Sequence, residues 1–447
     1  MIRTIAPRSI FRFQGTTHHK KRAVIFDKIQ RNDNIPKSIK LLNLLNRSFS
    51  TKDPKPKNEV DIFNKQLKKY SWLKSIDGAN QAIQLLTSIK QNEEIQPNIT
   101  SYNLVLEAIS KSSDSNAGLL AEEILNDIKN DGSVIPDVAT YTNIINAYAN
   151  SDEAIDKVES LLHECIQNFK DNGNDDDNNN LEPNKILYTS MINTYAKTNH
   201  HEKAIELLKE MHELHNSQTY KFIKPDIISY NAVLNAVANS TSNQKSQIAQ
   251  EILKEIHALS QEDESMKPNN RTYNAVIKSI AKSGAKDAGK QAEEVLRLIY
   301  GGNDLNPNAL VYTSVMEAYL NNNADVGNKI HELLNEMMTL YNKNRNKYIR
   351  PTVLNYNLAM KAYHNHNHPN KVEEILKLAM DDYKLKNNTR GKPNEHSFEI
   401  LLDSWSTQKS ANVIDKTYQC FDWMKSMNVQ VNERIRGKID ALMEMKK

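Results

Sequence analysis

A short motif recurs along the chain: a proline is followed five positions later by an aromatic residue that opens an apolar stripe. In the copy that begins at Pro225, the residues Tyr230, Val233, Leu234 and Val237 lie at i, i+3, i+4 and i+7. This spacing places all four side chains on one face of an α-helix. Further copies begin at Pro97, Pro136, Pro183, Pro268, Pro307, Pro351 and Pro393. The motif therefore predicts a chain built from repeated helical units.

The aromatic residues define the period of the repeat, because successive ones stand 39 to 47 positions apart. They are Phe63, Tyr102, Tyr141, Tyr188, Tyr230, Tyr273, Tyr312, Tyr356 and Phe398. After each first helix, a polar break precedes a second amphipathic stretch, such as that of Ala204, Leu207, Leu208 and Met211. One helical hairpin cannot bury both apolar stripes alone, so neighbouring hairpins must stack. We therefore expect an all-α protein, a right-handed α-solenoid of stacked helix-turn-helix repeats with long inter-repeat loops.

The composition agrees with a helical protein and excludes two other classes. The chain has only 12 glycines among 447 residues, and almost no stretch alternates apolar and polar residues at period two. Both observations favour helices over strands. No run approaches 18 consecutive apolar residues, so we expect no transmembrane helix. The two cysteines, Cys165 and Cys420, are too few for a disulfide framework or a multi-cysteine metal site.

The first 49 residues differ from the rest of the chain in charge. Residues 1–26 contain six arginines and lysines and no acidic residue, which is typical of a mitochondrial presequence. Arg47 and Phe49 stand before Ser50 in the pattern of a mitochondrial processing site, so we expect cleavage after Phe49. A plastid address is the alternative. We expect residues 1–49 to be a disordered presequence and residues 50–59, with two prolines and three lysines, to be a linker.

The repeated block reads proline, Asp or Asn, two variable residues, Ser or Thr, Tyr, then Asn or Thr. This block, followed by a second helix that opens at an alanine, resembles the pentatricopeptide repeat family. The resemblance covers residues 60–432 as about nine helical hairpins, with clear repeats at 99–394. The units are longer than is usual in the family. We expect residues 433–447 to form a C-terminal capping helix.

The family binds single-stranded RNA, and the resemblance implies that two residues of each repeat read one base. The first reader follows the aromatic residue directly, and the second follows the proline that ends the unit. The implied pairs are Asn103 with Asp137, Thr142 with Asn184, Thr189 with Asp226, Asn231 with Asn269, Asn274 with Asn308, Thr313 with Thr352 and Asn357 with Asn394. By the family's code they imply the 5′ to 3′ reading U-A-G-Y-Y-N-Y. Amides, hydroxyls and carboxylates suit this role because they hydrogen-bond to base edges.

The resemblance implies two further sets of RNA contacts. Two positions before the aromatic residue, an apolar or planar side chain would stack on a base, and these are Ile186, Ile228, Arg271, Leu310 and Leu354. Near the end of the first helix, a lysine would meet a phosphate, and these are Lys111, Lys197 and Lys282. Structural alternatives stay open, because the polar readers also suit helix caps and a lysine is favourable at any helix C-terminus.

The sequence shows no catalytic or cofactor motif. It lacks a phosphate-binding loop, a nucleophile elbow and a paired-cysteine motif. His364, His366 and His368 alternate in one loop, but no carboxylate or cysteine completes a metal site by spacing. We therefore expect a protein that binds no metal or cofactor and is not an enzyme.

The leading interpretation is a monomeric RNA-binding protein of the mitochondrial matrix, with the plastid as the alternative location. It would act in RNA stabilisation, processing or translation by binding alone. Its partners would be single-stranded RNA and proteins of an RNA-processing or ribosomal complex. The alternative function is a protein-binding α-solenoid, either a scaffold or a ribosome-associated factor. Charge favours this alternative, because residues 50–447 hold 47 basic and 53 acidic residues, a net charge of −6.

Overall fold

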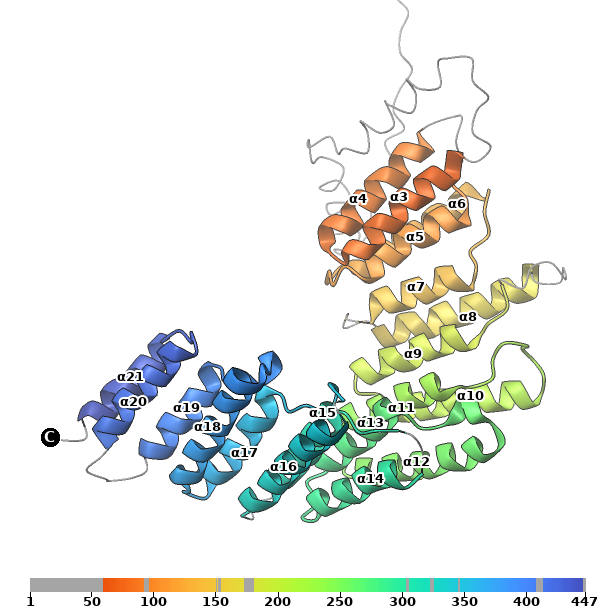
Figure 1. The fold of residues 1–447 in the computed structure, drawn as a ribbon. Helices are drawn as coiled ribbons and strands as arrows, with labels where there is room; N and C mark the ends of the chain where they lie inside the picture. Colours follow the sequence, from red (N-terminus) through yellow and green to blue (C-terminus); the bar gives the residue numbers. More distant parts are fainter. Residues whose placement is uncertain are drawn as a thin grey trace, which may run out of the picture. The chain divides into compact units, whose positions relative to one another are not determined.

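The computed structural model describes residues 59–91, 96–149, 151, 154–172, 181–302, 305–321, 325–344, 346–406 and 413–444. The expected presequence and nearly all of the expected linker lie outside these ranges. The chain divides into two compact units, and the boundary falls between Pro225 and Asp226. Within the described ranges every regular element is a helix, so the expected all-α class is confirmed (Figure 1).

The described part of the first unit consists of four helical hairpins, each of which pairs a first helix with the second helix that follows it (Figure 1). The first helices are α3 (Glu59–Leu73), α5 (Ile99–Ser110), α7 (Val138–Tyr148) and α9 (Lys185–Lys197). The second helices are α4 (Ile76–Lys90), α6 (Ala117–Asp131), α8 (Ala154–Asn172) and α10 (His201–Asn216). Successive first helices contact one another, and α4, α6 and α8 each contact the first helix of the next hairpin as well. The first helices therefore form one layer of the stack.

The described part of the second unit repeats this arrangement with five hairpins and one final helix. Its first helices are α11 (Ile227–Asn239), α13 (Asn270–Ala281), α15 (Ala309–Leu320), α17 (Val353–Asn365) and α19 (Glu395–Ser406). Its second helices are α12 (Lys245–Glu262), α14 (Ala288–Gly302), α16 (Gly327–Asn344), α18 (Pro369–Lys386) and α20 (Val413–Ser426). Short 3-10 turns, η1 (Glu264–Met266) and η2 (Thr389–Gly391), follow α12 and α18. The final helix α21 (Glu433–Glu444) contacts α19 and α20, as the next first helix of the stack would.

Most first helices begin with a cap supplied by the residue after the motif's proline. At α7 the Asp137 carboxylate accepts a hydrogen bond from the backbone N–H of Thr140 at 2.8 Å. The Thr140 hydroxyl in turn accepts one from the backbone N–H of Asp137 at 3.1 Å. This capping box gives partners to two amide groups that a helix start leaves unpaired. The same box forms at α5, α13 and α17. The implied second readers are thus also helix caps.

The aromatic residue of the motif joins the two helices of its hairpin. The phenol of Tyr141 donates to Glu164 on α8 at 2.9 Å, and that of Tyr188 donates to Glu210 on α10 at 3.0 Å. Burial and the neighbouring carboxylates raise the pKa of both phenols, so they remain protonated donors. The fixed spacing between proline and aromatic residue follows from this geometry. The cap after the proline starts the first helix, and the aromatic residue joins that helix to the second helix of the hairpin.

Three glycines near the start of second helices make room for a tyrosine of the next hairpin. The pairs are Gly118 with Tyr148, Gly289 with Tyr319 and Gly327 with Tyr363. A Cβ atom at Gly327 would lie 2.5 Å from Cδ1 of Tyr363. Carbon atoms in contact prefer a separation of about 3.5–4.0 Å, so any larger residue would force the two hairpins apart. The tyrosine and the glycine therefore set how closely successive hairpins stack.

Candidate nucleic-acid interface

Asn103 and Asp137, the first implied reader pair, lie in hydrogen-bond contact. The Asn103 side chain on α5 donates from Nδ2 to both carboxylate oxygens of Asp137, at 2.9 and 3.1 Å. Because Asp137 caps α7, the pair joins two successive first helices. One amide and one carboxylate thus stand side by side at the junction of two hairpins, where they can address the same base.

The last implied pair has the same geometry in the second unit. Asn357 on α17 donates from Nδ2 to Oδ1 of Asn394 at 3.3 Å. Asn394 stands at the start of α19, where its Oδ1 also accepts from the backbone N–H of Ser397 at 3.2 Å. Asn357 and Asn394 are 37 residues apart, so the stacking of hairpins brings them together.

A further pair, which is not among the implied readers, joins Asn64 to Asn98. The Nδ2 atom of Asn64 on α3 lies 3.4 Å from Oδ1 of Asn98, the cap of α5. The signal was present in the sequence, because Asn64 follows Phe63 and Asn98 follows Pro97. The series of paired reader positions thus begins one hairpin earlier than we expected.

Two threonine readers bond to their own helices. Thr142 donates to the carbonyl oxygen of Val138 at 2.7 Å, and Thr313 donates to that of Ala309 at 2.8 Å. Thr313 also accepts from Nδ2 of Asn355 at 2.9 Å. A hydroxyl that already donates its proton to its own helix can only accept a hydrogen bond from a ligand. The threonine and asparagine readers therefore differ in what they can present to a base.

The remaining second readers stand at the starts of first helices. They are Asn184 at α9, Asp226 at α11, Asn269 at α13, Asn308 at α15 and Thr352 at α17. The pair of Thr189 with Asp226 is divided between the two units, so its pairing remains a prediction. Base reading by any of these residues also remains a prediction.

Asn231 and Asn274 occupy the first-reader position of α11 and α13. The Oδ1 atom of Asn274 accepts from the hydroxyl of Ser314 at 2.9 Å. Asn231 is only 2% exposed, and its Oδ1 is buried without a hydrogen-bond partner. A buried polar atom without a partner costs about 1–3 kcal/mol. Among the readers that the structure describes, Asn231 therefore carries an oxygen that would gain from a new donor.

Four aliphatic residues that the resemblance assigns to base stacking are exposed to solvent. Their exposed fractions lie between 45% and 61%, whereas the aromatic residues two positions later are buried. The four are Ile186, Ile228, Leu310 and Leu354. Arg271 is also exposed, at the same position of α13. A singly exposed leucine needs no explanation, but apolar residues that recur at one position of the first helices are available for the planes of bases to cover.

The three lysines implied to meet phosphates differ in their surroundings. Lys111 forms an ion pair with Glu107 at 2.5 Å, and Lys68 shares the same carboxylate at 3.2 Å. Lys197 is exposed at the last residue of α9. Lys282 is exposed beyond the end of α13. Partial desolvation of its ammonium group, together with the charge of Lys278, lowers its pKa. A phosphate beside Lys282 would relieve this repulsion between like charges.

Carboxylates interrupt the positive charge on the first helices. Burial raises the pKa of Glu317 on α15, in spite of the nearby Lys278 and Lys282. Glu399 takes the first-reader position of α19, where it is buried and lies 3.5 Å from Arg434. RNA binding by these helices would therefore rest on stacking and base contacts as well as on phosphate contacts.

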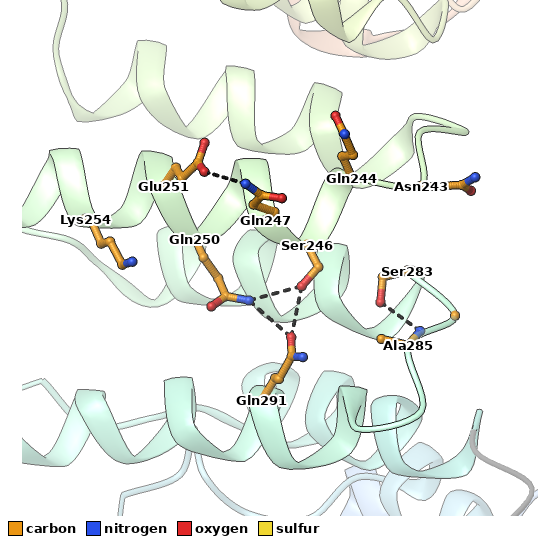
Figure 2. A pocket seen from close by; sticks show the side chains of 11 residues that line it. Asn243, Gln244, Ser246, Gln247, Gln250, Glu251, Lys254, Ser283, Ala285 and Gln291 are labelled. Atoms are coloured by element: carbon orange, nitrogen blue, oxygen red, sulfur yellow. Dashed lines mark hydrogen bonds between the residues drawn. The ribbon is translucent and has the colours of Figure 1, made fainter.

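A polar groove of about 630 Å³ lies on second helices of the second unit. Figure 2 shows side chains from α12, from α14 and from the turn between α13 and α14 along its wall. Gln250 donates to the hydroxyl of Ser246 at 3.1 Å and to Oε1 of Gln291 at 3.2 Å, so these groups satisfy one another. None of the implied readers lines this groove.

Three further properties of the described ranges bear on metal binding, thiol reactivity and membrane spanning. No group of three or more histidine, cysteine and carboxylate side chains there could hold a metal ion. Cys165 and Cys420 are free and buried, and burial raises the pKa of both thiols to about 12. In the part of the chain that the structure describes, no helix has the length and apolar character needed to cross a membrane.

Two protein-family models match adjoining segments of the chain. The model described as the PPR repeat matches residues 186–215, and the model described as the pentatricopeptide repeat domain matches residues 214–283. No curated protein matches the chain.

Similar solved structures include two of pentatricopeptide repeat proteins. One is PPR10 in complex with an 18-nucleotide psaJ RNA element, which has 16% sequence identity and a TM-score of 0.46. The match covers 83% of this chain and 51% of that one, so the chain spans about half the length of the RNA-bound protein. The other is PPR10 from maize, with 14% identity, a TM-score of 0.35 and coverage of 96% of this chain and 70% of that one.

Proposed function

This chain is a pentatricopeptide repeat protein, and we propose that it binds single-stranded RNA along the first helices of its hairpins. The observation that carries the proposal is the set of exposed apolar residues on the first helices, which stand close in sequence to the amide readers. Apolar side chains stack on the faces of bases without regard to sequence, and amides and carboxylates distinguish base edges. Together they make a surface suited to unpaired RNA.

The proposed action is occupancy alone. The first helices carry side chains that can hold bases and phosphates, and this action requires no chemical step. A bound segment would be protected from nucleases or kept free of structure, which would serve RNA stabilisation, processing or translation. The arginine-rich, acid-poor sequence of residues 1–26 supports the mitochondrial matrix as the location, and processing after Phe49 is part of this proposal.

Filter binding with U-A-G-Y-Y-N-Y oligomers tests the proposal. The double variant Leu310→Ala/Leu354→Ala should bind at least about tenfold more weakly, because stacking contributes about 1–3 kcal/mol per base. Its free energy of unfolding should change little, since both leucines are exposed. The matched control is Leu385→Ala, which alters an exposed leucine on the second helix α18. Unchanged affinity of the double variant, or equal binding of a scrambled oligomer by the wild type, would contradict the proposal.

One observation favours protein binding as a second candidate. Glu317 and Glu399 place carboxylates on the first helices, and residues 50–447 are net acidic. A basic segment of a partner protein would complement these charges. A partner that stays bound after RNase treatment, together with the failure of the RNA test, would favour this candidate.

A further inference from the structure

At α5, α7 and α19, the residue directly before the motif's aromatic residue carries a hydroxyl that reaches the preceding repeat. The Thr140 hydroxyl on α7 lies 2.8 Å from Oδ1 of Asn103 on α5 and 2.9 Å from Oδ1 of its own cap, Asp137. It also accepts from the backbone N–H of Asp137. The capping box of one helix is thus connected to the reader of the helix before it.

This connection fixes which way the Asn103 amide faces. The Asp137 carboxylate can only accept hydrogen bonds, so the amide must turn Nδ2 toward it, at 2.9 and 3.1 Å. The Oδ1 atom of Asn103 then faces the Thr140 hydroxyl, which supplies the donor. A flipped amide would set its oxygen against the carboxylate, which is unfavourable. The orientation of the reader is therefore held by the Asp137 carboxylate and by Thr140, which stands 37 positions further along the chain.

The same contact recurs in both units. Ser101 donates to Oδ1 of Asn64 at 2.8 Å, and Ser397 donates to Oδ1 of Asn357 at 2.7 Å. Both serines, like Thr140, are at most 1% exposed. The hydroxyls are too deeply buried to touch RNA themselves, so any influence on base selection must act through the asparagine.

The second unit also holds a natural counterexample. Thr272 stands at the same position as Thr140 and is equally buried, and it bonds to its own cap, Asn269. The reader before it, Asn231, has no hydrogen-bond partner for its Oδ1. A hydroxyl at this position therefore secures the cap in both repeats but orients the reader in only one of them.

We propose that the buried hydroxyl before the aromatic residue is a positioning residue, which sets the orientation of the reader amide in the preceding repeat. This inference rests on the proposed RNA-binding function. An oriented amide presents its remaining N–H beside the acceptor of the second reader, so only a base edge with the complementary pair of groups fits both. An amide without this contact is held on one side only, so it turns over more readily and can accept either arrangement. Repeats in which the hydroxyl bonds to the reader amide should therefore accept fewer bases than repeats without this hydrogen bond.

A double-mutant cycle in the free, full-length protein tests the contact without RNA. The cycle combines Asn103→Ala with Thr140→Val, and the matched cycle combines Asn231→Ala with Thr272→Val. Amide hydrogen exchange gives the opening equilibrium of α7 and α13, which suits a repeat protein whose hairpins open locally. The first cycle should show coupling of about tenfold in the opening constant, and the second less than about twofold. Equal coupling in the two cycles would overturn the proposal.

Selection from a random RNA pool tests the role in base choice. Thr140→Val should reduce the base preference by about tenfold at one position of the selected sequence and leave the others intact. Thr140→Ser, which keeps the hydroxyl, should restore the preference. Thr272→Val, which loses only the capping contact, should leave every preference unchanged. Thr140→Val with the full preference of the wild type would overturn the positioning role.

The two tests separate the two proposals. If the wild type enriches no sequence, the proposed function fails and the role in base choice fails with it. The coupling between Asn103 and Thr140 is measured independently of that result. If the wild type enriches a sequence and the coupling is absent, the proposed function stands and only the positioning role is lost.

Discussion

At the scale of the residue, the candidate interface uses the same side chains for folding and for recognition. Asp137 caps α7, accepts from the Asn103 amide and lies beside the Thr140 hydroxyl. A cap contributes typically about 1 kcal/mol, so loss of the carboxylate would weaken the helix as well as any contact to RNA. A substitution that preserves the cap is needed to separate the two roles.

Asp137→Asn is such a substitution. Asparagine and aspartate cap helices about equally well, so we expect the free energy of unfolding to change by less than about 0.5 kcal/mol. The acceptor at this position becomes a group that can also donate, so the preferred base at the corresponding RNA position should change. Hydrogen exchange in α7 and RNA selection measure the two effects. Asp137→Ala is the control, and it should lose both the helix cap of α7 and the base preference. If Asp137→Asn prefers the same base as the wild type, the prediction is contradicted.

At the scale of the element, the closeness of successive hairpins depends on glycines that meet tyrosines. Gly289 on α14 accepts the ring of Tyr319 from α15, and the Tyr319 phenol donates to Glu293 at 2.5 Å. Glu293 also meets Arg297 at 2.9 Å and Lys329 of α16 at 3.0 Å. The space that Gly289 leaves for the Tyr319 ring and the Glu293 carboxylate thus join three helices, α14, α15 and α16.

Gly289→Ala should destabilise this contact, because the added Cβ overlaps the ring of Tyr319. Overpacking of this kind costs about 1–3 kcal/mol. Gly437→Ala is the matched control, since Gly437 lies within α21 with open space around it, and it should stabilise the protein by up to about 1 kcal/mol. Thermal unfolding measures both. If Gly289→Ala is as stable as the wild type, the space at Gly289 does not determine how closely successive hairpins pack.

The same carboxylate predicts a pH dependence of stability in the second unit. Burial alone would raise the pKa of Glu293, but hydrogen bonds from Tyr319, Arg297 and Lys329 outweigh it and lower the pKa below its ordinary value. The charged form is therefore favoured in the folded state, so its stabilising effect is present above about pH 4.5 and is lost as the pH falls through the lowered pKa. Glu293→Gln should be less stable than the wild type at pH 7, and the difference should shrink on acidification. A difference that stays constant with pH would contradict this assignment.

At the scale of the whole molecule, the distribution of charge separates residues 1–49, here called the leader, from the repeats. The chain carries a net charge of +3, whereas residues 50–447 carry −6. Phosphate attraction that comes from the leader is independent of base sequence and is screened by salt. The leader should therefore add to binding strength without adding to base preference.

A comparison of the full chain with residues 50–447 tests this prediction. The full chain should bind scrambled RNA more tightly at low salt, with a steeper dependence of log K on log salt, by about 0.7 per additional phosphate contacted. The base preference obtained by RNA selection should be the same for both proteins. Equal salt slopes would show that the leader makes no contact with the RNA.

Much of the fold could be predicted from the sequence, because its determinants are local. The stripe that begins at Tyr230, the proline and the cap that precede it all act within one or two helical turns, and they specify hairpins that must stack. The pair of Asn357 with Asn394 was also foreseeable, since its members occupy fixed positions in successive repeats. The pair of Asn64 with Asn98 followed the same rule and was missed only because its repeat is atypical.

The tertiary structure alone decided how the readers are held. Thr140 orients Asn103 but Thr272 does not orient Asn231, although both threonines stand at the same motif position. The sequence of a single repeat cannot distinguish these cases, because a side chain's partner depends on how closely the next hairpin packs. A shift of less than 1 Å makes or breaks a hydrogen bond, whereas the pattern that forms a helix tolerates it. The sequence by itself thus determined the hairpins and their order, and the packing between hairpins determined which amides are oriented.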